Sequence, residues 1–401
     1  MSKKFKILVR KFEPFERIVD IFWNQYRQKS ATKLELEAIA LDLPELHAAI
    51  LSGYFDVAHV NTDWLAQCNK LKILENLTPY IESSPPEDYP NDWTKVHLSL
   101  QTFEDTVLGI PFHDGPECLI YRKDLFNDKI EKENYEKLYK CELKPPETWD
   151  EFVRIADFFN RPEKGMYGTL FALYPDGHNN VFDFGLQVWS RGGSLVNEQG
   201  HIMVYSPEAV EAMEFYRSLI NEPFVHPKSR DLESISACWT FAKGEAAMMV
   251  NWFGFATVCE TDKNSNVKGC IDICSVPHAA SFNEPISLSV YYTWSVSSKS
   301  QNKQESYNFI RNSVSKENDA ILPFEGAISC RRSTWFNPKI NKIIPYYNRL
   351  DKIHEYVRTL PRTPEWHDVS KVIDGLVLDV INTEKSVDLI LNEAQSRIDN
   401  I

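Results

Sequence analysis

The ten residues DVAHVNTDWL, at Asp56–Leu65, place a short apolar strand directly before the start of a helix. The residues before this stretch alternate in the same way, with strands predicted at 6–10 and 34–41 and helices at 15–26 and 46–51. Strands that alternate with helices in this order pair in parallel and are covered by helices on both faces. The first part of the chain is therefore predicted to form an α/β lobe.

A second series of strands and helices begins after residue 113. Apolar strands are predicted at 107–112 and 118–122, and the polar break HDGPE at His113–Glu117 lies between them. Further strands are predicted at 167–173 and 246–250, each next to helical segments. The renewed alternation predicts a second α/β lobe.

Several helix starts are marked by residues that satisfy the free amides of a first turn. Thr148 and Glu151 have the spacing of a capping box, in which each side chain binds a backbone N–H at the other end of the turn. Ser206 precedes a proline and is placed to cap a second helix. Helices are also predicted at 302–314 and after Ser386. Their apolar faces must pack against a larger part of the protein.

The composition is that of an ordinary soluble protein with an acidic balance. The chain has 401 residues, and 44 Lys and Arg against 57 Asp and Glu give a net charge of −13. An acidic chain is not drawn to nucleic acid by its overall field, so we expect no nucleic-acid partner. The 10 Trp and 17 Tyr suit a protein that stacks on flat ligand faces, although aromatic side chains also fill cores.

The start of the chain and its eight cysteines bear on localisation. Lys6 and Arg10 confine the first apolar run to residues 7–9, which is shorter than the core of a secretory leader. No run approaches the ~18 apolar residues of a membrane span, so no membrane insertion is expected. Scattered cysteines without a Cys-x-x-Cys pair are typical of small buried side chains in a reducing compartment, although an even number leaves disulfides open. The location stays open between the cytoplasm and export with a leader removed.

The sequence contains none of the common signatures of catalytic, nucleotide-binding or metal-binding sites. Gly-x-Gly-x-x-Gly, phosphate-loop, His-Glu-x-x-His and Gly-x-Ser-x-Gly motifs are all absent. His113 and Asp114 are adjacent, and neighbouring residues of a strand face opposite sides, so they are not expected to share a proton. His59 lies inside an apolar strand and is expected to be a core histidine. We therefore expect no cofactor, no bound metal and no catalytic residue.

Six parts of the chain, in order, carry motifs that resemble the family 1 extracellular solute-binding proteins of ABC importers. They are the Asp-Trp-Leu segment at 56–65, the Gly-x-Pro and Tyr-x-Lys-Asp-Leu-Phe segments at 107–112 and 118–126, the Pro-x-Thr-Trp-Asp-Glu helix start at 145–152, and the segments at 206–212, 241–248 and 326–333. The resemblance extends over nearly the whole chain.

The resemblance implies a two-lobed fold of the type II periplasmic-binding-protein kind, with a hinge and a ligand cleft between the lobes. With chain crossings near residues 112, 276 and 326, the N-terminal lobe would comprise 1–112 and 277–325, and the C-terminal lobe 113–276 and 326–401. Two facing α/β lobes bring two sets of strand ends together, and closure about the hinge would bury the ligand.

Candidate ligand-binding residues follow from the rule that ligands of open α/β sheets lie at the carboxyl ends of strands. Trp and Tyr stack on the apolar faces of a sugar ring, while acids, amides and bases bind its hydroxyls. The resulting set comprises Lys11, Phe12, Glu13, Asn61, Asp63, Trp64, His113, Asp114, His178, Asn251, Trp252, Tyr292, Trp294 and Arg331.

Several of these residues have a structural alternative. Trp252 and Trp64 can pack in the core, Asp63 can stabilise the start of a helix, and Arg331 can form a pair across the two lobes. Asp114 is the leading candidate for ligand binding, because an acidic residue between two apolar strands is unusual unless it has a functional role.

Together, these observations predict a monomeric carbohydrate-binding protein that performs no covalent chemistry. It would close on a sugar, sugar derivative or short oligosaccharide and present it to ABC permease subunits. His113, Lys11 and Arg331 also leave an acidic sugar open. An alternative is a cytoplasmic sensor or scavenger on the same fold, which would need no permease.

A second alternative is a glycoside hydrolase. That reaction needs two carboxyl groups about 5–10 Å apart across the bound sugar. Asp114 with Asp63 or Glu13 is the pair that the strand-end rule makes available.

Overall fold

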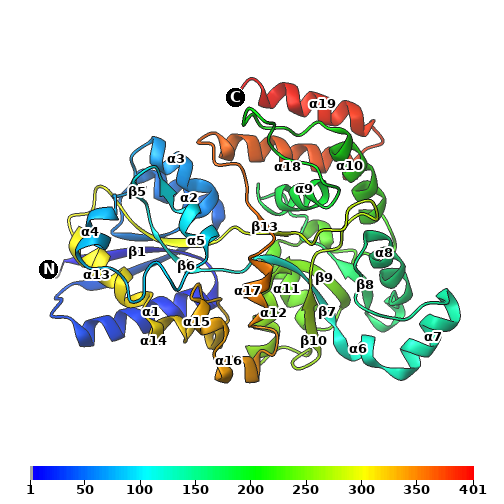
Figure 1. Ribbon diagram of the computed structural model, residues 1–401, viewed down its shortest axis with the longest axis horizontal. Coiled ribbons are helices and arrows are strands. Elements are labelled where there is room, and N and C mark those ends of the chain that lie inside the picture. Colours follow the sequence, from blue (N-terminus) through cyan, green and yellow to red (C-terminus); the bar gives the residue numbers. More distant parts are fainter. Residues whose placement is uncertain (1–2) are drawn as a thin grey trace. The chain divides into compact units, whose positions relative to one another are not determined.

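The computed structural model describes residues 3–401 and divides into two compact units (Figure 1). Unit 1 contains the residues through Gly115 together with 290–354 and 362–366, and unit 2 contains 116–289, 355–361 and 367–401. The α/β architecture predicted from the alternation of strands and helices is confirmed in both units.

The division differs from the one expected on sequence in two longer segments, and residues 113–115 and 362–366 also belong to unit 1 rather than to the second lobe. Residues 277–289 belong to unit 2, because Ser287 donates a hydrogen bond from its hydroxyl to the Glu117 carbonyl at 2.6 Å. Residues 326–354 belong to unit 1, where the Ile328 carbonyl accepts the Asp114 N–H at 3.1 Å. The expected crossings near 276 and 326 missed these pairings because each joins residues more than a hundred positions apart.

Unit 1 is built on a five-stranded sheet with the order β2-β1-β3-β12-β6. The strands are β1 (Lys4–Arg10), β2 (Glu35–Leu41), β3 (Val57–Asn61), β6 (Ile110–His113) and β12 (Tyr292–Val296). β1 pairs in parallel with β2 and β3, whereas β12 runs antiparallel to both β3 and β6. The carboxyl ends of β1, β3 and β6 and the first residue of β12 therefore meet at one edge of the sheet.

Helices cover both faces of this sheet, as the apolar strands require. Ile7 and Val9 of β1 pack into a core with α1 and α13, while Leu8, which points to the opposite face, packs with α2 and α3. The helices of unit 1 are α1 (Glu13–Lys29), α2 (Leu43–Ser52), α3 (Leu65–Lys70), α4 (Thr78–Ser83), α5 (Lys95–Leu100), α13 (Lys303–Ser313), α14 (Lys316–Asp319), α15 (Arg332–Trp335), α16 (Pro338–Ile343) and α17 (Arg349–Ile353). A small hairpin joins β4 (Thr102–Phe103) to β5 (Thr106–Val107).

Unit 2 is built on a four-stranded sheet with the order β10-β7-β9-β8. The strands are β7 (Glu117–Arg122), β8 (Tyr167–Leu170), β9 (Ala246–Trp252) and β10 (Ile271–Cys274), and a separate pair joins β11 (Ser287–Leu288) to β13 (Val357–Arg358). β8 runs parallel to β9, and β7 runs antiparallel to β9 with Glu117 opposite Trp252. One edge of this sheet therefore carries the end of β9 beside the start of β7.

The remaining helices belong to unit 2, apart from the first residue of α18. They are α6 (Lys123–Asn127), α7 (Lys129–Tyr139), α8 (Trp149–Phe158), α9 (Asn179–Trp189), α10 (Pro207–Ile220), α11 (Ser234–Ala242), α12 (Phe253–Thr261), α18 (Trp366–Asn382) and α19 (Val387–Ile398). The two predicted caps are confirmed: Thr148 and Glu151 form a capping box at the start of α8, and Ser206 accepts the Ala209 N–H at 3.1 Å. The strand predicted at 167–173 ends earlier, at Leu170.

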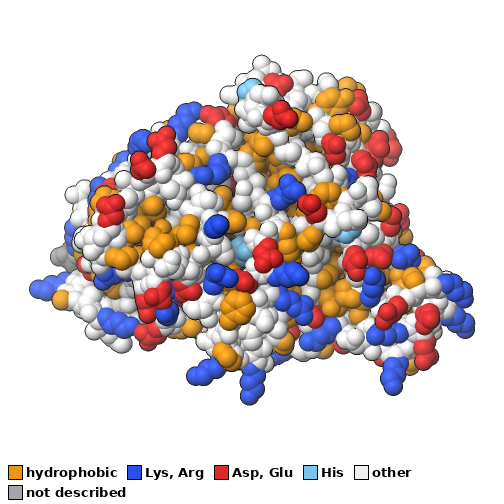
Figure 2. Space-filling model, viewed as in Figure 1, with side chains coloured by type: hydrophobic (Ala, Val, Ile, Leu, Met, Phe, Trp, Pro, Cys, Tyr) orange, Lys and Arg blue, Asp and Glu red, His pale blue; other side chains and the backbone are white. Residues whose placement is uncertain are grey.

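Three further features concern the cysteines, the surface charges and the apolarity of the helices. All eight cysteines are free, and five of them are buried. Acidic and basic side chains are interspersed over the face that Figure 2 shows, without a large basic area. No helix within residues 3–401 combines the length and apolarity needed to cross a membrane.

Candidate functional site

The sheet edge of unit 1 carries two partly exposed aromatic rings. Phe12 follows β1, and Tyr292 begins β12 opposite Asn61 and His113. Both rings pack against the buried Phe15, with ring centroids 5.1 Å and 5.9 Å away. This packing fixes two apolar surfaces at the strand ends, as the strand-end rule predicts.

Polar groups surround these rings. Asn61 ends β3, and its buried Oδ1 accepts no hydrogen bond from the residues that the structure describes. Asp63 is partly exposed, and Lys11 and Glu13 are exposed. The Glu13 carboxylate accepts a hydrogen bond from Arg17 at 2.8 Å, one helical turn away. Unit 1 therefore offers an amide and an acid beside its two rings.

The structure places three other predicted residues of unit 1 in the interior. Trp294 is fully buried, with its ring 4.1 Å from that of His59. It lies two residues along β12 from Tyr292, so it shares the face of Tyr292 but sits about 7 Å deeper in the sheet. Trp64 packs against His47, and Arg331 is fully buried. We therefore leave these three side chains out of the proposed site.

His113, the last residue of β6, lies at the sheet edge, and its imidazole is neutral. Its Nδ1 accepts the Ile328 N–H at 3.0 Å, and its ring lies 4.6 Å from that of Phe15. Burial lowers the pKa of His113 to about 4, although Asp114 acts in the opposite direction. His113 therefore carries no positive charge near neutral pH, so it gives no reason to expect an acidic ligand.

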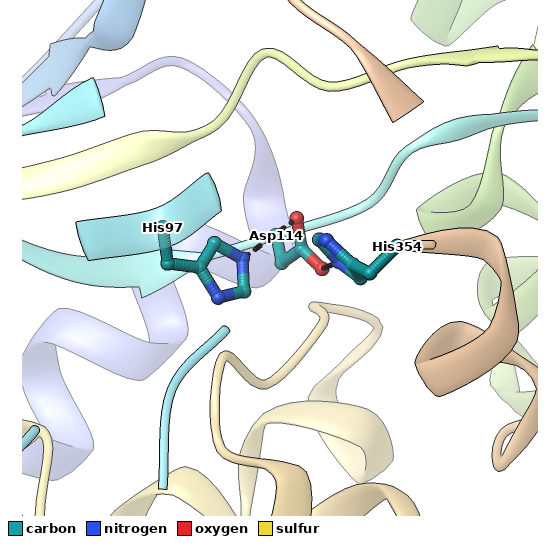
Figure 3. A group of neighbouring side chains, drawn as sticks. All are labelled: His97, Asp114 and His354. Atoms are coloured by element: carbon teal, nitrogen blue, oxygen red, sulfur yellow. Dashed lines mark hydrogen bonds and ion pairs between the residues drawn. The ribbon is translucent and has the colours of Figure 1, made fainter. Parts of the chain in front are cut away.

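Asp114 lies between two histidines rather than on an open surface (Figure 3). Its Oδ2 is 2.7 Å from His354 Nε2, and its Oδ1 is 3.2 Å from His97 Nε2. Burial alone would raise the pKa of Asp114, but the two neighbouring imidazoles hold it well below its usual range. Both carboxylate oxygens are therefore engaged within unit 1, and we leave Asp114 out of the ligand-binding set.

The sheet edge of unit 2 is centred on Trp252, the last residue of β9. Its partly exposed ring meets Phe182 edge to face, with centroids 5.2 Å apart and planes at 81°. Asn251 is buried; its Oδ1 accepts the Trp252 N–H at 2.8 Å, and its Nδ2 donates to the Ser234 carbonyl at 3.3 Å. Asn251 therefore positions the backbone of Trp252. Its side-chain amide makes hydrogen bonds within unit 2 through both Oδ1 and Nδ2.

The start of α9 borders this edge. The Asp176 carboxylate accepts the N–H groups of His178 and Asn179, at 2.9 Å and 3.1 Å, and so caps the helix. His178 is buried, with its ring 5.6 Å from that of Phe182. The predicted residue thus supports the ring that contacts Trp252.

Two carboxyl groups at this edge were missed by sequence reasoning. Glu117 is opposite Trp252 in the sheet, and Asp183 lies one residue after Phe182 in α9. Burial, and then the neighbouring Asp183, raise the pKa of Glu117 well above its usual range. Burial raises the pKa of Asp183 to about 7, opposed by a hydrogen bond from the Tyr216 hydroxyl. The strand-end rule considered only carboxyl ends, whereas Glu117 starts an antiparallel strand.

The raised pKa of Asp183 predicts a pH-dependent stability. Because the folded state holds this proton more tightly than the unfolded chain, the free energy of unfolding should fall as pH rises from about 4 through about 7. Asp183→Asn should make this fall shallower and stabilise the protein at pH 8 by on the order of 2 kcal/mol. Urea unfolding at several pH values measures it.

The control for this prediction is Glu198→Gln, which removes a charge from an exposed loop. It should leave the slope of stability against pH as in the unmodified protein. An Asp183→Asn variant with an unchanged slope would show that Asp183 is ionised in the folded protein throughout this range.

Comparison with known proteins identifies the family. The family model of bacterial extracellular solute-binding proteins matches residues 22–320. The chain belongs to this family. The solute-binding protein is also similar to a protein of Brucella abortus whose name describes it as a binding protein, with 21% identity over 359 residues that cover 86% of this chain and 79% of the relative.

Solved structures show the same fold. The maltose-bound MalE3 protein of T. maritima matches this solute-binding protein with a TM-score of 0.85 and 20% identity over 100% of both chains. An ABC transporter solute-binding protein of Agrobacterium radiobacter K84, solved in complex with ribitol, matches with a TM-score of 0.86 and 21% identity, covering 99% of this chain and 98% of its own. These similarities confirm the two-lobed α/β solute-binding fold.

Proposed function

We propose that this solute-binding protein binds a hydroxyl-rich ligand, a sugar, sugar derivative or short oligosaccharide, as a monomer and without covalent chemistry. It would present the ligand to ABC permease subunits. The observation that carries this proposal is the partly exposed Trp252 ring, set beside Phe182 and the Glu117 carboxyl at the end of β9.

The chemistry of this edge suits a sugar or polyol. A pyranose has apolar C–H faces that stack on an aromatic ring, and its hydroxyls donate and accept hydrogen bonds around the rim. Trp252 provides the ring, and carboxyl groups provide rim partners whether protonated or ionised. Phe12 and Tyr292 at the edge of unit 1, with Asn61 nearby, offer the same combination. The maltose and ribitol complexes of proteins with this fold agree with the proposed ligand class.

The charges at the two edges favour a neutral or amine-bearing ligand over an acidic one. Of the three basic residues that left an acidic sugar open, Arg331 is fully buried and the low pKa of His113 keeps its imidazole neutral, so Lys11 is the one that offers a positive charge at the edge of unit 1. Glu117 and Asp183 instead place carboxyl groups at the edge of unit 2. Because burial raises the pKa of both groups, an added carboxylate on the ligand would be repelled, and bind more weakly, only where these acids ionise, for Asp183 above about pH 7.

The carboxyl pairs that the hydrolase alternative named both contain Asp114. Asp114, which the hydrolase alternative required, is engaged by His97 and His354. Glu117 and Asp183 remain as a carboxyl pair, so aryl glycosides test the alternative directly. Release of the phenol on incubation with the protein would replace binding with hydrolysis as the function.

Titration calorimetry against a panel of sugars and polyols tests the proposal. The panel should include monosaccharides, maltose-type oligosaccharides, polyols, an amino sugar and a uronic acid. We expect saturable binding of one ligand per chain for at least one neutral or amine-bearing member, and weaker binding for the uronic acid. Absence of binding across the panel would overturn the assignment of a sugar or polyol ligand.

A further inference from the structure

Three potential metal ligands, none of them proposed to bind the solute, meet in the interior of unit 1 next to the end of β6 (Figure 3). His97 comes from α5, Asp114 follows β6, and His354 follows α17. One ligand atom from each lies within 4.8 Å of the others. Residues far apart in the sequence are thus brought to one point by the fold.

The atoms of this cluster are buried and incompletely satisfied. The side chains of His97 and Asp114 are fully buried, and that of His354 is 3% exposed. His97 Nε2 and Asp114 Oδ1 contact each other as an ion pair at 3.2 Å, whereas the Nδ1 atoms of the two histidines make no hydrogen bond with any of the residues described. Buried polar atoms without partners are rare in native proteins, and they call for an explanation.

The two contacts of Asp114 use different carboxylate oxygens, and one ligand atom from each of the three residues lies within 4.8 Å of the others, so the side chains would draw together around one ion. With metal–ligand bonds of about 2.0–2.1 Å, two ligands of a tetrahedral Zn²⁺ site are about 3.3 Å apart. The 3.2 Å between Asp114 and His97 matches this spacing. The 2.7 Å between Asp114 and His354 is that of a hydrogen bond and would lengthen by about half an ångström when an ion displaces the shared proton.

The charge of the cluster also favours a cation. A buried carboxylate needs a compensating charge, and the groups that face Asp114 here are two imidazoles rather than a lysine or arginine. Two imidazoles and a carboxylate form a typical ligand set for Zn²⁺ with one position left for water. A divalent ion would neutralise the carboxylate and bind one nitrogen of each histidine.

The surrounding residues hold the three side chains in place. The His354 ring stacks on Trp335 at 5.0 Å with an angle of 11°, and the His97 ring meets Tyr291 edge to face at 5.0 Å. The Asp114 backbone is fixed by its hydrogen bond to the Ile328 carbonyl. Ligands that are held in this way lose little conformational freedom when they bind an ion.

We propose that His97, Asp114 and His354 bind one divalent transition-metal ion, with Zn²⁺ as the best fit. Because the ion would join three segments of unit 1, its binding should stabilise the folded state. None of the three side chains belongs to the set proposed to bind the sugar, so the metal and sugar proposals can be tested separately.

Cobalt binding tests the proposal on the full-length protein. Metal-free protein titrated with CoCl₂ should develop the intense visible absorption of four-coordinate Co²⁺, saturating at one ion per chain, and ZnCl₂ should displace it. X-ray absorption should show nitrogen and oxygen neighbours without sulfur. Absence of a stoichiometric Co²⁺ signal, or sulfur ligation by the cysteines, would overturn the proposal.

Variants locate the ion. Loss of an outer partner of a metal ligand costs ~10–100-fold in affinity, so removing a ligand in His354→Gln or His97→Gln should cost more than about 100-fold. His226→Gln is the matched control, because His226 is also buried beside a carboxylate, Glu245, at 3.2 Å. Retained affinity in both ligand variants would overturn the assignment. Should neither variant fold, the sulfur-free Co²⁺ spectrum and the rise in melting temperature with ZnCl₂ decide it in the unmodified protein.

Discussion

Trp252→Ala is expected to weaken sugar binding about a hundredfold. The substitution removes the partly exposed ring at the end of β9 that we propose stacks on the sugar. Loss of a central aromatic anchor costs ~2–4 kcal/mol of binding free energy, and about 2.7 kcal/mol corresponds to a factor of one hundred. Titration calorimetry with the best ligand of the panel measures the change.

Trp239→Ala is the matched control for this experiment. Trp239 is also a partly exposed tryptophan of unit 2, but it lies in α11 and outside the proposed site. We expect its removal to leave the affinity within a factor of about two, while both variants keep the circular dichroism of the parent. Equal affinity in the Trp252→Ala variant and the parent would exclude Trp252 from the site.

Arg331→Ala should destabilise the protein by about 3–5 kcal/mol, because it breaks a buried ion pair and leaves the partner charge behind. The fully buried guanidinium bonds to the Asp92 carboxylate at 3.0 Å and to the carbonyls of Val314 and Glu87 at 2.8 Å and 2.7 Å. It also lies 4.3 Å from the Trp93 ring. Urea unfolding followed by tryptophan fluorescence measures the loss.

The next residue in the chain provides the control. Arg332 pairs with Asp351 at 2.8 Å, but its side chain is 49% exposed. Exposed ion pairs contribute ~0–1 kcal/mol, so Arg332→Ala should change stability by less than about 1 kcal/mol. Similar losses in the two variants would show that the Arg331 contacts contribute no more than an exposed pair.

Local patterns allowed much of the fold to be predicted. The capping residues Thr148 and Ser206 act within three residues of their own position, so the sequence pattern contains all the information needed. The uniformly buried β3 was recognisable because a strand covered on both faces is apolar throughout. The motifs that resemble solute-binding proteins led to the family that the comparisons confirmed.

The candidate site was less predictable because its residues are selected by distant contacts. Asp114 and His354 are 240 positions apart, and no pattern near Asp114 indicates that a histidine will cover it. Trp294 shares a face of β12 with Tyr292, as predicted, but it is buried in the sheet instead of lying at the sheet edge. How far a residue lies from the edge depends on where β12 ends relative to the neighbouring strands, which the local sequence does not show. Glu117 could have been found by extending the strand-end rule to the first residues of antiparallel strands.

The interleaved construction of unit 1 has a consequence during synthesis. β12, which lies between β3 and β6 in the sheet, begins at Tyr292, after the whole of residues 116–289. At ~5–20 residues per second a ribosome needs roughly 10–35 seconds to translate that insertion. Throughout this interval the nascent chain presents β3 and β6 without the strand that joins them, and such unpaired edges promote aggregation. Cells that make this protein are therefore expected to shield it with chaperones before translation ends.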